Sequence, residues 1–119
     1  MLSEALNEQG KTGQAEQYIN LVRQRARESY LYDSNLPGYG TIPDGLLPDI
    51  TGSSQSSLRD AIRHERRVEL GFEFHRYFDI IRYGENYAND ALSDKENFSY
   101  SKYMHFPIPQ SELNTNFKL

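Results

Sequence analysis

The sequence has neither cysteine nor tryptophan among its 119 residues. The lack of cysteine excludes disulfides, thiolate metal sites and thiol catalysis, although it does not distinguish a reducing compartment from an oxidising one. No apolar run approaches the length that spans a bilayer, and residues 1–10 show neither the basic nor the apolar region of a signal peptide. These absences leave the compartment of the protein open.

An excess of positive charge is also absent. The chain has 13 lysines and arginines against 17 aspartates and glutamates, with a pI near 5.3, which argues against a broad polyanion-binding surface. Arginines are frequent between Arg59 and Arg82, but acidic residues are interleaved with them and would oppose contact with phosphates. We therefore expect no nucleic-acid partner.

What the sequence does contain is the pattern of a mainly helical protein. Residues 2–9 are good helix formers that end at Gly10. Residues 14–29 repeat apolar side chains at helical spacing, with Thr12 as the predicted N-cap. Residues 1–29 thus predict two antiparallel helices with a short connection, the unit of a helical repeat, and one apolar face of such a pair needs a further partner.

A long segment rich in proline and glycine, residues 30–56, follows the helix pair and excludes a long regular element there. Such a loop is often functional, and an apolar connector fixed by its Leu and Ile side chains is an equal alternative. Tyr30, Tyr32 and Tyr39 in or beside it could stack on a sugar ring. Simple packing of loop aromatics is the other interpretation of the same residues.

The next segment, residues 57–84, predicts further packed helices. Ser57 and Asp60 fit a capping box that opens a helix to about Phe72. A kink is expected near Gly71, followed by a helix over residues 74–83 that Gly84 ends. Residues 85–101 are polar and rich in turn formers, and residues 102–119 are expected to be extended around their two prolines and to end in coil.

Charged residues dominate this helical segment. Glu65, Glu69 and Glu73 recur every four residues, so in a continuous helix they would lie in one row and repel one another. Nearby arginines could neutralise the row. We expect a structural, partly buried ion network made of Glu65, Arg66, Glu69, Glu73, Arg76, Asp79 and Arg82.

Catalytic and metal-binding interpretations of these carboxylates are weaker. A di-metal helix bundle needs a histidine three residues after a glutamate, and here Val68 follows Glu65 and Arg76 follows Glu73 at that spacing. Surrounding arginines would keep the carboxylates ionised, whereas a glycosidase needs one with a raised pKa. The three histidines lie in no recognisable triad. We expect no metal, no cofactor and no catalytic residue.

Residues 62–84, IRHERRVELGFEFHRYFDIIRYG, closely resemble the ERRxELxFExxRxxDxxR(W/Y)G signature near the C-terminus of SusD/RagB-type nutrient-binding lipoproteins. Residues 4–25 resemble the last tetratricopeptide-like helix pair of that family, and residues 106–112, FPIPQSE, its closing PIPxxE segment. Departures are small: Phe74 stands where the family usually has glycine, and Tyr83 where tryptophan is common.

The resemblance implies that residues 1–119 are the C-terminal part of a single, longer α-helical domain. It implies a non-catalytic protein, lipid-anchored through an N-terminal segment absent from this chain, on the extracellular face of the outer membrane. That protein would capture oligosaccharides, starch-like or other, for import through a SusC-like TonB-dependent transporter. No sugar-contacting residue carries over, and the signature residues carry over as structural elements only.

Two other functions fit the residues less well. One is a tetratricopeptide-like module that binds a protein partner through its helical face, and the other is a carboxylate-dependent glycan hydrolase. Loss of oligosaccharide retention in tyrosine variants of the loop would favour glycan capture over the protein-binding module, and a hydrolytic rate that depends on Glu69 would favour the hydrolase.

Overall fold

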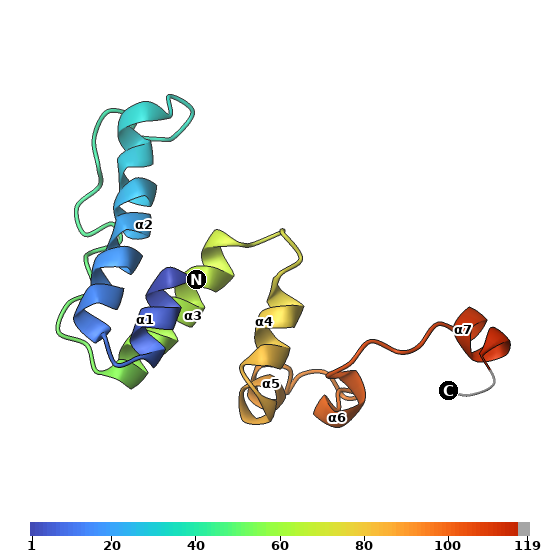
Figure 1. The fold of residues 1–119 in the computed structure, drawn as a ribbon. Helices are drawn as coiled ribbons and strands as arrows, with labels where there is room; N and C mark the ends of the chain where they lie inside the picture. Colours follow the sequence, from blue (N-terminus) through green and yellow to red (C-terminus); the bar gives the residue numbers. More distant parts are fainter. Residues whose placement is uncertain (117–119) are drawn as a thin grey trace. The chain divides into compact units, whose positions relative to one another are not determined.

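The computed structural model describes residues 1–116 of the chain, and within them every regular element is a helix (Figure 1). The mainly helical fold class is therefore confirmed. The chain divides into two compact units, residues 1–69 and residues 70–119. The helices are α1 (Leu2–Glu8), α2 (Thr12–Tyr32), α3 (Gln55–Glu69), α4 (Arg76–Arg82), α5 (Glu85–Ala91), α6 (Tyr100–Tyr103) and α7 (Gln110–Thr115).

The first unit packs α1, α2 and α3 around a small apolar core. Its buried side chains come from α2 and α3: Ala15, Ile19, Leu58 and Ile62. Asn7 of α1 is fully buried, and its amide donates to the carbonyl oxygen of Gln55 at 2.8 Å. The Gln55 amide donates in return to the carbonyl oxygen of Asn7 at 2.6 Å. A reciprocal amide contact therefore joins the end of α1 to the start of α3.

Two predicted helix starts are wrong by a few residues. Thr12 belongs to α2 and does not cap it, and its hydroxyl instead donates to the Asn7 side chain at 3.4 Å. The predicted cap of α3, Ser57, is the third residue of the helix, and its backbone N–H donates to the Ser54 hydroxyl at 3.1 Å. Ser54 therefore occupies the capping position, since a side-chain oxygen there accepts from the third helical N–H.

The loop between α2 and α3 lies along α2 and is bonded to it by a row of polar side chains, as its course beside the helix shows (Figure 1). The donors and acceptors on α2 are Glu16, Asn20, Arg23 and Arg27, whose spacings of four, three and four place them on one helix face. We call this set the loop-binding row.

Contacts of the loop-binding row run antiparallel to the loop. Arg27 donates to the carbonyl of Leu47 and to Asp49, while Arg23 Nε donates to the carbonyl of Pro48 at 3.0 Å. Further toward the start of α2, Asn20 exchanges two hydrogen bonds with the backbone of Ile50, at 2.8 and 2.9 Å. Glu16 accepts from the N–H of Ser53 at 2.7 Å. Side chains of α2 thus satisfy several backbone polar groups of loop residues 47–53 and fix this part of the loop along the helix.

A break of six residues separates α3 from α4. The segment Leu70–His75 is not helical, and Phe72 and Phe74 have positive φ values of 68° and 60°. The predicted helix over residues 74–83 therefore begins two residues later than expected, and Glu73 leaves the row of glutamates. Glycine adopts positive φ without steric cost, which gives a physical reason for the glycine that the resembled family usually has where Phe74 stands.

The second unit consists of the short helices α4 to α7. Ile80 and Ala88 are buried, and Gly84, with φ of 95°, allows the turn from α4 into α5. The Tyr100 hydroxyl donates to the carbonyl oxygen of Ile81 at 3.2 Å. The expectation of an irregular segment after residue 84 is corrected by α5, α6 and α7. No helix enters Pro109 from its N-terminal side, as expected. The chain does not continue as coil after it, because Pro109 directly precedes the first residue of α7. The predicted coil at residues 117–119 lies outside the described residues.

Candidate functional site

The predicted ion network separates between the two units. In the first unit, Glu65 lies 2.7 Å from Arg23 and Glu69 also contacts Arg25, so α2 supplies these cations and not the neighbouring turn of α3. Arg66, which was expected to pair with Glu69, is half-buried in α3. These two pairs join α2 to α3 in addition to the apolar core.

In the second unit, Asp79 and Arg82 form the predicted pair, with Arg82 Nε 3.0 Å from Asp79 Oδ1. Arg76, expected beside Glu73, instead donates to the Tyr87 hydroxyl at 3.3 Å. Glu73 lies 3.9 Å from the imidazole of His75. The break after α3 changes the partners because it removes Glu73 from the helical register that the prediction assumed.

Arginine and tyrosine alternate around the end of α4. The guanidinium of Arg82 lies 4.7 Å from the centre of the Tyr83 ring, and that of Arg76 lies 5.7 Å from the Tyr87 ring. The two tyrosine rings meet edge to face, 5.1 Å apart. Stacking of guanidinium groups on aromatic rings stabilises such a layer. These contacts fit the structural role expected of the signature arginines.

The three tyrosines suggested for sugar stacking are not gathered into one platform. Tyr30 and Tyr32 belong to the last turn of α2, where Tyr30 is half-buried and Tyr32 is exposed. Tyr39 is exposed in the loop, next to Gly40, whose N–H donates to the carbonyl of Tyr30 at 2.8 Å. Tyr39 is therefore near Tyr30 through the backbone, while Tyr32 projects from the helix end.

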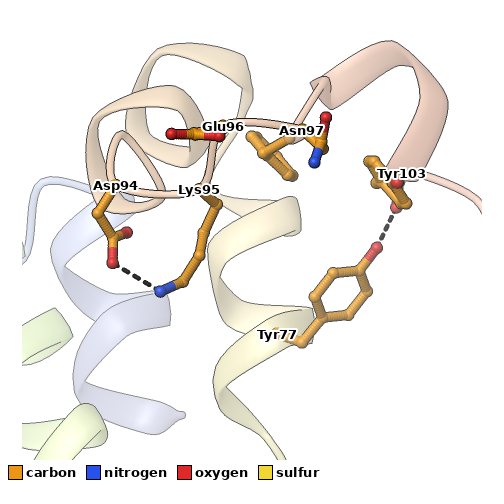
Figure 2. Close-up of a pocket in the computed structure, with 7 residues that line it drawn as sticks. Tyr77, Asp94, Lys95, Glu96, Asn97 and Tyr103 are labelled. Carbon is orange, nitrogen blue, oxygen red and sulfur yellow. Dashed lines mark hydrogen bonds and ion pairs between the residues drawn. The ribbon is translucent and has the colours of Figure 1, made fainter.

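A pocket of about 480 Å³ lies within the second unit (Figure 2). Its aromatic walls are Tyr77, Phe98 and Tyr103, and its polar walls are the consecutive residues 94–97. The rings of Phe98 and Tyr103 are stacked with centres 6.0 Å apart. Figure 2 shows the Tyr77 hydroxyl directed at the backbone of Tyr103, whose carbonyl oxygen accepts a hydrogen bond from it. Aromatic walls beside amide and carboxylate groups suit a polyhydroxylated ring.

The Asp94 carboxyl of this pocket does not suit a general acid. Lys95 Nζ lies 2.6 Å from Asp94 Oδ2, and this hydrogen bond lowers the pKa of the Asp94 carboxyl. A general acid in glycoside hydrolysis needs the opposite, a carboxyl whose pKa is raised. A second cation, Lys102, lies 5.1 Å from the centre of the Tyr103 ring. The geometry therefore offers contact surface and hydrogen bonds without an evident catalytic pair.

Sequence reasoning did not single out this pocket. Residues 94–98 fall in the polar segment that carried no pattern beyond turn formers, and the tertiary contact with Tyr77 brings them together. Phe98 and Tyr103, aromatic residues in an otherwise polar stretch, were the available signal. Within residues 1–116, no three His, Asp or Glu side chains are placed to hold a metal together. Within the same range, no helix combines the length and apolarity needed to cross a bilayer.

Comparison with known proteins gives a consistent result. The sequence model of the SusD family matches residues 1–119. The chain is 34% identical to SusD-like protein P2 of Formosa agariphila, over 98% of this chain and 22% of that protein. It is 33% identical to SusD-like protein P25 of the same organism, over 98% of this chain and 20% of that protein. No solved structure gives a significant match. The chain thus spans about a fifth of the length of these relatives.

Proposed function

Because this chain belongs to the SusD family, a family whose general role is nutrient capture through glycan binding, we propose that it is the C-terminal part of a longer cell-surface protein that holds oligosaccharides for uptake. The observation that carries the proposal is the match of the family model over residues 1–119. The chain supplies structural helices of that protein and does not catalyse a reaction on the glycan.

The proposed location is the extracellular face of the outer membrane, with a lipid anchor at the N-terminus of the longer protein. The proposed partner is a SusC-like TonB-dependent transporter that receives the captured oligosaccharide. Both proposals follow from the family alone. The signature residues, from Glu65 to Arg82, would hold helices together in that protein, as the Arg23–Glu65 ion pair and the Arg76–Tyr87 contact do here.

The pocket of the second unit is the best candidate within this chain for contact with a sugar. Its ring pair, Phe98 and Tyr103, and the side chains of Glu96 and Asn97 could meet the apolar face and the hydroxyls of a pyranose. Tyr39 is a second candidate because it is exposed in a loop that α2 holds in place. Tyr30 and Tyr32 are weaker candidates, since both belong to the last turn of α2 and Tyr30 is half-buried there.

Calorimetry on the longer protein tests the function. Titration with maltoheptaose, and with a panel of other neutral and acidic oligosaccharides, should give heat for at least one ligand. Chromatography after prolonged incubation should recover that ligand uncleaved. Cleavage of the ligand would show that the protein hydrolyses glycans instead of only capturing them. The lack of heat with every glycan would contradict the proposal of glycan capture.

Matched variants then locate the contact. Phe98→Ala should weaken binding about tenfold if the pocket meets the sugar, since that corresponds to about 1.4 kcal/mol of lost contact. Tyr39→Ala tests the loop in the same way. Tyr18→Ala is the control, because it removes an exposed aromatic ring of α2 that is not a candidate for sugar contact. If all three variants bind the sugar as tightly as the unmutated protein does, the sugar contacts belong to the rest of the longer protein.

A further inference from the structure

Two phenylalanines in the break between α3 and α4 are exposed and strained. Phe72 is fully exposed and Phe74 is 90% exposed. Both have backbone φ values in the left-handed region, 68° and 60°. For residues other than glycine this region costs about 1–2 kcal/mol each, because Cβ crowds the following carbonyl oxygen.

A backbone hydrogen bond from Glu73 N–H to the carbonyl oxygen of Leu70, at 3.2 Å, spans the turn at Phe72. The two phenylalanine side chains add no contact within the described residues that repays the cost of their backbone conformation. No ring contact, hydrogen bond or ion pair involves the Phe72 or Phe74 side chain among residues 1–116. A strained backbone persists when surrounding structure determines it. A large aromatic side chain held in solvent contributes nothing of that kind, so the compensating contact must come from a surface outside the described chain.

More aromatic surface in the same unit is also uncovered. Phe78 and Phe106 are exposed, and their ring centres lie 5.8 Å apart. Monomeric proteins rarely leave contiguous apolar surface of this kind in water, and such patches mark an interface. Large aromatic rings are typical of the fully buried core of permanent interfaces, whereas transient interfaces are more polar.

The length of the relatives identifies the occupant. SusD-like proteins P2 and P25 are about five times as long as the region that they share with this chain. A permanent apolar partner that is always present at equal concentration is the remainder of the same polypeptide. We propose that Phe72 and Phe74 are anchors that insert into the part of the longer SusD-like polypeptide upstream of residue 1, and thereby hold the break between α3 and α4 in its left-handed conformation.

Thiol labelling of the longer protein tests this proposal. The chain has no cysteine, so Phe72→Cys and Phe74→Cys each add one thiol, and the parent protein supplies the background. Maleimide should react at least about tenfold more slowly with each folded variant than with the same variant in denaturant. Labelling of the purified protein at the denatured rate would overturn the proposal.

Two controls separate the other occupants. Protection that appears only at high protein concentration would assign the surface to a second copy, and protection that appears only with a transporter present would assign it to that partner. Either result overturns the proposal. If a cysteine variant fails to fold, hydroxyl-radical footprinting of the unmutated protein reports directly on the two rings: low oxidation in the folded monomer supports the proposal, and oxidation equal to that in denaturant contradicts it.

Discussion

The guanidinium of Arg23 and the carboxylate of Glu65 meet at 2.7 Å, with only 12% and 11% of their side chains exposed. Arg23 comes from α2 and Glu65 from α3, and Arg23 Nε also donates to the carbonyl of Pro48 in the loop. One mostly buried arginine thus joins three segments of the first unit. The signature glutamate at position 65 acts in this fold as the partner of that arginine.

Replacing Arg23 with alanine should therefore be costly. The change would leave the Glu65 carboxylate buried without its cation, and breaking a buried pair costs about 3–5 kcal/mol. Urea unfolding followed by circular dichroism measures the loss. Arg25→Ala is the matched control, because Arg25 pairs with Glu69 while 71% exposed and should cost about 1 kcal/mol or less. Equal losses in the two variants would contradict the buried role of Arg23.

The loop should detach locally when Asn20 is changed. Asn20→Ala removes both hydrogen bonds to the Ile50 backbone, and unsatisfied buried groups of this kind cost about 1–3 kcal/mol. Hydrogen exchange at the Ile50 amide should accelerate while the amides of the α3 core remain protected. Asn20→Asp keeps the acceptor for Ile50 N–H and should retain most of that protection. Unchanged exchange in Asn20→Ala would mean that the apolar side chains alone hold the loop.

Acid should weaken the contact between α1 and α3. Arg59 donates to both carboxylate oxygens of Glu8, at 2.6 and 2.7 Å, and these hydrogen bonds lower the pKa of Glu8 below its ordinary value of 4.5. A lowered folded-state pKa stabilises the fold above the unfolded pKa, and this stability is lost as the pH falls through the folded pKa. As the pH is lowered below about 4.5, the melting temperature of the unmutated protein should therefore fall more steeply than that of Glu8→Gln. Parallel curves would show that the pair contributes nothing.

Glycine should be preferred to alanine at position 74. Both substitutions remove the ring, but only glycine removes the strain of a φ of 60°. The free energy of unfolding of Phe74→Gly should therefore be about 1 kcal/mol higher than that of Phe74→Ala. Val68 in α3 is the control with the opposite sign: there Val68→Gly should be less stable than Val68→Ala by about 1 kcal/mol. Denaturant titration of the four variants measures these differences. A Phe74→Ala variant more stable than Phe74→Gly would mean that the break is helical in solution.

Sequence patterns predicted where the helices lie better than where they end and which side chains form ion pairs. The apolar spacing of residues 14–29 placed α2 correctly because buried positions such as Ala15 and Ile19 follow the helical repeat. The cap of α3 was misplaced since Ser54 and Ser57 are both good capping residues, and only the packing of Leu58 and Ile62 on α2 decides which serine lies at the helix start. Local chemistry alone does not choose between them.

The break after α3 and the pocket were beyond the reach of pattern reading. Phe74 favours a continuous helix or an extended chain by local propensity, and nothing in the local sequence signals the positive φ that it adopts. Long-range pairs such as Arg23 with Glu65 also have no local signature, because nearer arginines satisfy the same charge rule. The spacing of the loop-binding row was visible in the sequence, but its polar residues would equally suit a solvent-exposed face.

Titration calorimetry on the longer SusD-like protein, with uncleaved ligand recovered afterwards, tests the central claim of glycan capture most directly. Our account predicts saturable heat with at least one oligosaccharide and no hydrolysis product. No heat with any oligosaccharide in the panel, or the release of shorter sugars, would contradict it.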